Sequence, residues 1–188
     1  MPFVSVNGCQ IYYQDVGRGD PVVLVHGWPV SSLYWNNVIP DLARRRRVLA
    51  LDLKGFGRSD RPNCKAYRIA DLADDLAGFL DELGIASADL VGHSLGGMTS
   101  LFLALSHPRK VRRLVAVAAP VHGPSSLFWY LKPAAIPGIR TLVYTFSLVQ
   151  LARRVVGKVF TNGKPVPQDL LEEVGCVSYR CAVESQKS

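Results

Sequence analysis

The sequence predicts an α/β fold in which helices flank a mostly parallel sheet. Four short apolar runs, at residues 22–27, 47–53, 88–94 and 111–119, are nearly continuous, as is typical of strands buried on both faces. Segments with helical periodicity separate these runs, and strands that alternate with single helices form parallel βαβ units. The chain of 188 residues suits one such domain, and its 48% of hydrophobic residues suffices for a packed core.

A hairpin is expected ahead of the first parallel strand. Residues 3–7 and 10–14 both have strand character, and Asn7-Gly8 between them is a strong signal for a two-residue turn.

Three helical segments are expected between the strands. The first, around residues 35–42, contains Pro40, which we expect to kink or end it. The second covers residues 69–83 and the third residues 95–106. These two are expected to end at helix breakers, namely Gly84 and His107-Pro108.

The strand–helix alternation ends after Ala119. A Pro/Gly/Ser-rich stretch leads into a long amphipathic helical pattern, followed by a short helical start at 169–174. We therefore divide the chain into a core at 1–120 and an incomplete helical lid at 121–188. The lid aromatics are expected to line an apolar pocket or, for any single one, to pack the lid on the core: Phe128, Trp129, Tyr130, Tyr144 and Phe146.

Ser94 lies in the segment Gly92-His93-Ser94-Leu95-Gly96, between a predicted strand and a predicted helix. A strand-to-helix turn this sharp has no room for side chains at the flanking glycines, and it lifts the serine Oγ clear of the sheet. The helix N-terminus adds partial positive charge where an oxyanion would form. The pattern therefore predicts that Ser94 is a nucleophile.

The segment His26-Gly27-Trp28-Pro29 directly follows the predicted strand at 22–27. Acyl transfer needs two backbone N–H donors aimed at the developing oxyanion. We assign one to Leu95, the residue after the nucleophile, and the other to Trp28, because Pro29 has no N–H. A tight turn with no catalytic duty remains the alternative for this segment.

In combination these motifs resemble the α/β-hydrolase superfamily, in particular its lid-containing, serine-dependent members of the esterase and haloperoxidase type. The segments that carry the resemblance stand in the family's order and span residues 3 to about 174: HGWP (26–29), DLKGFGRSD (52–60), VGHSLGG (91–97) and HPRKVRRLVAVAAP (107–120). The resemblance implies an α/β-hydrolase fold with a partial lid and its last strands missing. It also implies serine-dependent hydrolysis of lipophilic carboxylic esters or related acyl compounds.

HGWP and GFGRSDRP are also similar to segments of haloalkane dehalogenases and epoxide hydrolases. Those enzymes use an aspartate nucleophile, because a carboxylate must attack carbon and form an ester. The corresponding residue here is Ser94, which disfavours dehalogenation and epoxide opening.

A serine nucleophile needs a base and an orienting acid, which in this superfamily follow in the order Ser, Asp/Glu, His. His26 is expected to serve in packing or to bridge loops, His93 adjoins the nucleophile, and His107 ends the following helix. His122 lies downstream of Ser94 but arrives two strands too early. Of the acids, Asp52 is expected to tie down the 55–60 loop, and the last candidates fall in the lid: Asp169, Glu172 and Glu173.

We therefore expect the chain to end inside its lid and to be nearly inactive in this form. The strand at 111–119 would then present an apolar edge through which copies could associate. The alternative function is a non-catalytic, hydrolase-like protein that binds a hydrophobic ligand or a partner. A third is membrane-surface binding through the basic amphipathic lid helix.

Composition argues against several other classes. The net charge is +7, but the basic residues are dispersed and no nucleic-acid motif accompanies them, so we expect no nucleic-acid partner. The N-terminus does not resemble a secretory signal, and no apolar run reaches the roughly 18 residues needed to cross a membrane. The cysteines show no paired spacing. We therefore expect a cytoplasmic protein with free thiols and no transmembrane segment. No dinucleotide fingerprint, P-loop or metal-ligand spacing is present, so we expect neither cofactor nor metal.

Overall fold

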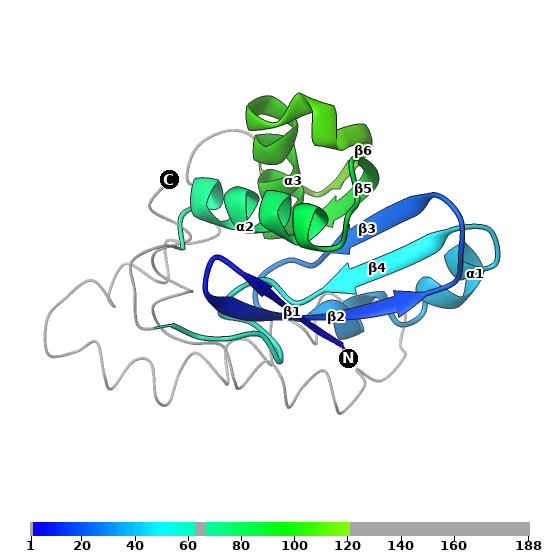
Figure 1. Ribbon diagram of the computed structural model, residues 1–188, viewed down its shortest axis with the longest axis horizontal. Coiled ribbons are helices and arrows are strands. Elements are labelled where there is room, and N and C mark those ends of the chain that lie inside the picture. The colour runs from blue at the N-terminus through cyan, green and yellow to red at the C-terminus, as the bar shows by residue number, and fades with distance from the viewer. Residues whose placement is uncertain (1, 63–66, 121–188) are drawn as a thin grey trace, which may run out of the picture.

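The computed structural model describes residues 2–62 and 67–120 (Figure 1). These residues form an α/β fold whose six-stranded sheet has the order β1-β2-β4-β3-β5-β6. The strands are β1 (Phe3–Val6), β2 (Cys9–Val16), β3 (Pro21–Val25), β4 (Arg47–Leu51), β5 (Ala88–His93) and β6 (Val111–Val117).

The antiparallel and parallel parts of the sheet meet at β4. Strands β1 and β2 form the predicted hairpin, and β2 pairs antiparallel with β4. The turn residues Asn7 and Gly8 both have positive φ angles, of 49° and 77°, as a tight hairpin of this kind requires. Strands β4, β3, β5 and β6 are parallel to one another, which confirms the predicted parallel sheet.

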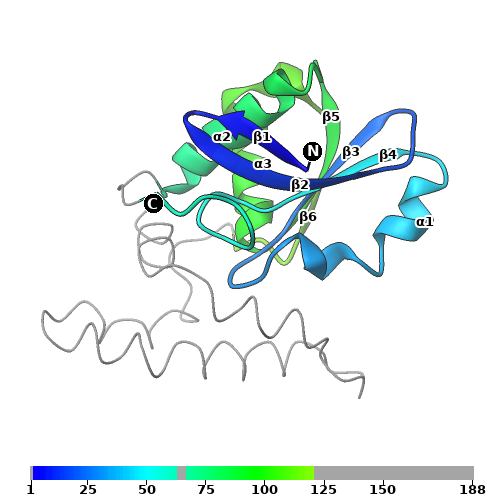
Figure 2. The same ribbon diagram turned by 60° about the horizontal axis from the view of Figure 1, so that its bottom comes forward.

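Helices cover both faces of the sheet. Helices α2 (Ile69–Glu82) and α3 (Leu95–Ser106) pack on one face over the larger apolar core, and the smaller core on the other face is covered by η1 (Ser32–Trp35) and α1 (Ile39–Ala43). Figures 1 and 2 show α2 and α3 together on one side of the sheet and α1 on the other. The last short helix is η2 (Pro108–Lys110), directly before β6.

The prediction that Pro40 kinks or ends the first helix was wrong. Helix α1 begins at Ile39, and Pro40 occupies its first turn. A proline is tolerated there because the N–H groups of the first turn have no intrahelical acceptor. The chain before it forms the separate short helix η1, which Ser31 caps by accepting a hydrogen bond from the Leu33 N–H.

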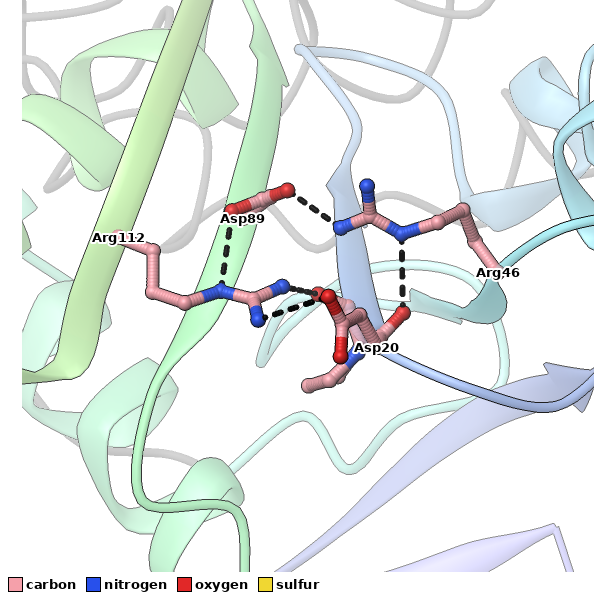
Figure 3. A network of polar contacts seen from close by, with 5 residues as sticks. Asp20, Arg46, Asp89 and Arg112 are labelled. Carbon is pink, nitrogen blue, oxygen red and sulfur yellow. Dashed lines mark hydrogen bonds and ion pairs between the residues drawn. The ribbon is translucent and has the colours of Figure 1, made fainter.

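The amino ends of the parallel strands are held together by a network of charged side chains (Figure 3). Asp89 at the start of β5 accepts hydrogen bonds from Arg46 and from Arg112 Nε, the latter at 3.1 Å. Arg112 also pairs with Asp20 at 3.2 Å, and Arg46 Nε donates to the Asp20 carbonyl oxygen at 3.1 Å. Four chain segments are thus joined at one end of the sheet.

Strand β6 has one neighbour, β5, in the described sheet, and its Val115 and Val117 side chains are 53% and 42% exposed. Self-association through this strand stays a prediction. The predicted lid at 121–188, with its aromatic residues and His122, lies outside the described residues. Among the helices that the structure describes, none combines the length and apolar character needed to cross a membrane.

Candidate active site

Ser94 lies in the sharp turn between β5 and α3. Its backbone has φ 50° and ψ −113°, a strained conformation for a residue other than glycine. The Ser94 N–H donates to the Val117 carbonyl oxygen at the end of β6 (2.9 Å), and the Ser94 carbonyl accepts from the Met98 N–H in α3 (3.0 Å). This turn at residues 92–96, which we call the elbow, is therefore anchored on both sides by backbone hydrogen bonds.

The flanking glycines are required by close backbone contacts. A Cβ atom at Gly92 would lie 2.4 Å from the Gly96 carbonyl oxygen, and one at Gly96 would lie 2.3 Å from the Val25 carbonyl oxygen. Real Cβ atoms do not approach backbone atoms so closely, so the start of α3 packs against β3 and β5 only because these side chains are missing.

The HGWP loop passes directly beside the elbow. The predicted strand at 22–27 ends at Val25, two residues earlier than expected, so that His26 and Gly27 belong to the loop. A Cβ atom at Gly27 would lie 3.0 Å from Ser94 Cβ and 2.8 Å from His93 Nδ1. The Trp28-Pro29 peptide bond is cis. Only a glycine allows the loop to approach the elbow this closely.

The two expected oxyanion donors lie on these two neighbouring segments. Leu95 is the first residue of α3, where an N–H has no intrahelical acceptor. The Trp28 N–H donates no backbone hydrogen bond to any of the described residues. The structure thus brings the segments of Trp28, Ser94 and Leu95 together, and their catalytic roles stay predictions.

His26 bridges two loops, as predicted. Its side chain is fully buried, its Nε2 accepts the Leu53 N–H at 3.0 Å, and its Nδ1 lies 2.8 Å from the Gly27 carbonyl oxygen. Burial lowers the pKa of His26 from its ordinary value, although the charge of Asp52 opposes this shift. The ring is therefore neutral near pH 7.

Asp52 ties down the 55–60 loop, as predicted. Its carboxylate accepts the Arg58 N–H at 2.8 Å and the Ser32 N–H at 2.7 Å, and its carbonyl oxygen accepts the Ser59 hydroxyl at 2.6 Å. Because Asp52 is buried and its oxygens are occupied by these structural bonds, it holds loops together around the site.

Tyr34 and His93 form a stacked pair that the sequence analysis missed. Their ring centroids are 4.8 Å apart with an angle of 21° between the planes. Burial lowers the pKa of His93 and raises that of Tyr34. The signal available in the sequence was an aromatic residue in the short segment after HGWP, but only the fold shows that it reaches the residue before Ser94.

No histidine in the described part of the chain hydrogen-bonds to the Ser94 hydroxyl. Both ring nitrogens of His26 are occupied, His93 stacks on Tyr34, and His107 lies beyond the far end of α3, 3.4 Å from Asp74. Residues 2–62 and 67–120 also contain no group of three His, Cys, Asp or Glu residues that could hold a metal ion. Among the described residues, the site therefore consists of a candidate nucleophile and two candidate N–H donors.

Comparison with known proteins agrees with this geometry. Residues 20–162 match the family described as the alpha/beta hydrolase fold. The chain is 44% identical over 119 residues to 2-hydroxy-6-oxo-2,4-heptadienoate hydrolase from Pseudomonas putida, a match that covers 62% of this chain and 43% of that protein. It is 39% identical over 135 residues to 2-hydroxymuconate semialdehyde hydrolase from Pseudomonas sp. (strain CF600), covering 68% and 48%.

Solved structures show the same fold. A crystal structure of an epoxide hydrolase from Bacillus megaterium superimposes with a TM-score of 0.83 at 22% identity, covering 98% of this chain and 70% of that one. The chain spans less than half the length of the two Pseudomonas relatives. With its family match, its sheet order and its elbow all in agreement, the chain belongs to the α/β-hydrolase fold family.

Proposed function

We propose that this protein is a serine-dependent hydrolase of carbonyl substrates, namely carboxylic esters or related acyl compounds with lipophilic groups. The observation that carries the proposal is the position of Ser94. It occupies a strained turn at the carboxyl end of β5, directly against the backbone of Gly27. Active sites of open α/β sheets lie outside the carboxyl ends of the parallel strands.

In the proposed reaction the Ser94 hydroxyl oxygen attacks the carbonyl carbon. The carbonyl oxygen becomes an oxyanion that accepts hydrogen bonds from the Trp28 and Leu95 N–H groups. Collapse of this intermediate expels the leaving group and leaves an acyl-serine ester, which water then hydrolyses. The base that takes the Ser94 proton has to come from residues outside the described part of the chain.

The chemistry of the nucleophile favours a carbonyl substrate over an epoxide. Attack of a serine oxygen on an epoxide carbon would form an ether, which water does not readily cleave. Attack on a carbonyl carbon forms an ester, which water can hydrolyse with the same oxyanion donors in place. The likeness to epoxide hydrolases therefore supports the fold, and Ser94 supports acyl transfer.

A second candidate, for the same site, is hydrolysis of an oxo-dienoate. The two Pseudomonas relatives, at 44% and 39% identity, are named for 2-hydroxy-6-oxo-2,4-heptadienoate and 2-hydroxymuconate semialdehyde. Both names describe carbonyl compounds, which the proposed nucleophile and donors would suit. In this case the bond broken lies between the attacked carbonyl carbon and a neighbouring carbon, which keeps the electron pair of that bond and takes up a proton as its fragment leaves.

The test uses the full-length protein with three substrates: p-nitrophenyl butyrate, 2-hydroxy-6-oxo-2,4-heptadienoate and styrene oxide. We expect turnover of the ester, the oxo-dienoate or both, and none of the epoxide. Ser94→Ala should lower kcat by about 10⁴- to 10⁶-fold. The matched control is Ser106→Ala at the exposed end of α3, which should retain full activity.

A fluorophosphonate should label the wild-type protein at Ser94, as peptide mass spectrometry would show. Turnover that survives Ser94→Ala, or turnover of the epoxide alone, would overturn the proposal. A well-folded protein that hydrolyses none of the three and is not labelled would instead support the non-catalytic, ligand-binding alternative.

A further inference from the structure

The hydrogen bonds of His26 define its tautomer. The Leu53 N–H can only donate, so His26 Nε2, at 3.0 Å, must be an unprotonated acceptor. In a neutral imidazole the other nitrogen then carries the proton. His26 Nδ1–H therefore donates to the Gly27 carbonyl oxygen at 2.8 Å.

The Gly27 carbonyl oxygen accepts a second hydrogen bond, from the Val30 N–H at 3.2 Å. Two donors thus hold one edge of the Gly27–Trp28 amide. This peptide is trans and planar, so its N–H points away from its C=O. The Trp28 N–H consequently points away from the His26 ring, and no described residue provides it with a backbone acceptor.

Because residue 27 is a glycine, the amide that follows it needs these two hydrogen bonds to keep a single orientation. A glycine restricts its own backbone dihedrals less than any other residue, so the amide that follows it can turn over at low cost. If it turned over, the Gly27 carbonyl oxygen would face the elbow where the Trp28 N–H is needed. Ser94 Cβ lies 3.0 Å from the position of a Cβ at Gly27, so the amide is close enough for its orientation to matter.

The His26 ring is itself held rigidly. It is fully buried and packs edge to face on Phe56 with a centroid distance of 5.3 Å. Its Nε2 accepts the N–H of Leu53, which directly follows Asp52. Asp52 in turn holds the loop that contains Arg58. The orientation of the Gly27 carbonyl is thus tied to the end of β4.

From this geometry we infer that His26 is a positioning residue, which acts through the Gly27 carbonyl to aim the Trp28 N–H at the substrate oxyanion. The inference rests on the proposed function, because the oxyanion arises only if Ser94 attacks a carbonyl. It adds a specific role for a side chain that touches neither substrate nor nucleophile. It also separates the two hydrogen bonds of His26 by function: Nδ1 serves catalysis and Nε2 serves anchoring.

Two substitutions separate these bonds. In His26→Asn the side-chain NH₂ can occupy the place of Nδ1 and still donate to Gly27, while the acceptor for Leu53 is lost. In His26→Gln the side-chain oxygen can occupy the place of Nε2 and still accept from Leu53, while the donor to Gly27 is lost. Each variant removes one hydrogen bond from the same buried site, so each controls for the destabilisation of the other. His107→Gln, beyond the far end of α3, is the unaffected control.

We expect His26→Gln to lower kcat by about 10²- to 10³-fold for p-nitrophenyl butyrate or, if only the oxo-dienoate is turned over, for that substrate, with KM changed only a few-fold; this is the usual effect of losing one oxyanion donor. His26→Asn should retain at least ten times more kcat than His26→Gln at a similar melting temperature. The preference for an ester over its thionoester should fall in His26→Gln, because a misaimed N–H no longer distinguishes oxygen from sulfur.

Equal losses of kcat in the two variants, following their losses of thermal stability, would show that His26 is only structural and would overturn the inference. A crystal structure of His26→Gln gives a readout that does not depend on activity. A Gly27–Trp28 amide in the wild-type orientation would overturn the inference, and a turned amide would support it. Failure of the proposed function is recognised separately, by activity that survives Ser94→Ala.

Discussion

The two ends of the parallel sheet differ in how their polar groups are satisfied. At the amino end, Asp20, Arg46, Asp89 and Arg112 pair with one another across the starts of neighbouring strands (Figure 3). At the carboxyl end, Ser94 adopts a strained backbone conformation. Buried polar atoms on the turn at Ser94 and on the loop and short helix after β3 have no hydrogen-bond partner among the described residues: Trp28 Nε1, Ser32 Oγ, Trp35 Nε1 and His93 Nδ1.

The difference shows how one sheet can support both stability and reactivity. Strained backbones and unpaired polar groups destabilise a fold, and they persist only where the surrounding structure enforces them. The same strands β3 and β5 run from the paired end to the strained end. Pairing at the amino end therefore offsets part of the loss in folding free energy that strain causes at the carboxyl end.

The largest expected effect comes from Gly96→Ala at the carboxyl end. The new Cβ would lie 2.3 Å from the Val25 carbonyl oxygen, so β3 and α3 would have to separate. We expect a loss of about 3 kcal/mol in the free energy of unfolding, measured by urea denaturation. The control is Gly84→Ala, which has open space and suffers only from a positive φ of 65°, with an expected loss of about 1 kcal/mol. Equal losses would mean that close packing at the elbow is not the cause.

Asp89→Asn tests the paired end. Arg46 and Arg112 would lose their shared carboxylate, whose side chain is only 14% exposed, and we expect stability to fall by about 2 kcal/mol. Asp41→Asn breaks an ion pair whose side chains are both 78% exposed and should have no measurable effect. We expect kcat at saturating substrate to be unchanged at a temperature where Asp89→Asn is fully folded. A fall in kcat would show that the ion pairs at the amino end also affect catalysis at the carboxyl end.

Ser94→Gly is expected to stabilise the protein by about 1 kcal/mol while abolishing activity, because glycine adopts a φ of 50° without strain. Ser94→Ala is the matched control: it removes the same hydroxyl but keeps a Cβ, so it should not gain stability. Thermal denaturation of both variants separates relief of backbone strain from loss of the hydroxyl. A Ser94→Gly protein no more stable than Ser94→Ala would mean that the elbow is unstrained.

The two ends should also lose stability in different pH ranges. Burial lowers the pKa of His26 and of His93, so the unfolded chain binds protons more readily than the folded one below about pH 6.5. Stability should therefore fall between pH 7 and pH 6, by up to about 0.7 kcal/mol from the fully buried His26 and by less from His93, which is partly exposed and screened by solvent. His93→Gln should show a correspondingly smaller decrease over this range.

Asp89 at the amino end affects stability in a more acidic pH range. Its burial alone would raise its pKa, but the hydrogen bond from Arg46 and the charges of Arg112 and Arg46 outweigh this and lower the pKa. Its contribution is present above the ordinary aspartate pKa of about 3.9 and is lost as the pH falls further. Asp89→Asn should remove this acid-range loss and keep the loss between pH 7 and pH 6. Denaturation curves at pH 7, 6, 5 and 3.5 would test both halves of the comparison.

Much of the fold could be predicted because each element carries a local signal. Apolar runs predicted β3 to β6, Asn7-Gly8 predicted the hairpin, and Gly84 marked the end of α2. Pro40 was misread, since a proline that breaks a helix interior also suits a helix start, and only the preceding turn at η1 decides between the two. Tyr34 was missed because its contact with His93 joins segments about 60 residues apart.

The sequence alone determined the order of the strands along the chain, the turn at Ser94 and the need for glycine on both sides of it. These follow from periodicity and from the backbone preferences of single residues, which are local properties. The tertiary structure decided which atoms meet: that Gly27 lies against Ser94, that the His26 ring donates to the Gly27 carbonyl, and that Asp89 is shared by two arginines. Such contacts depend on how distant segments pack in three dimensions, which no spacing along the chain specifies.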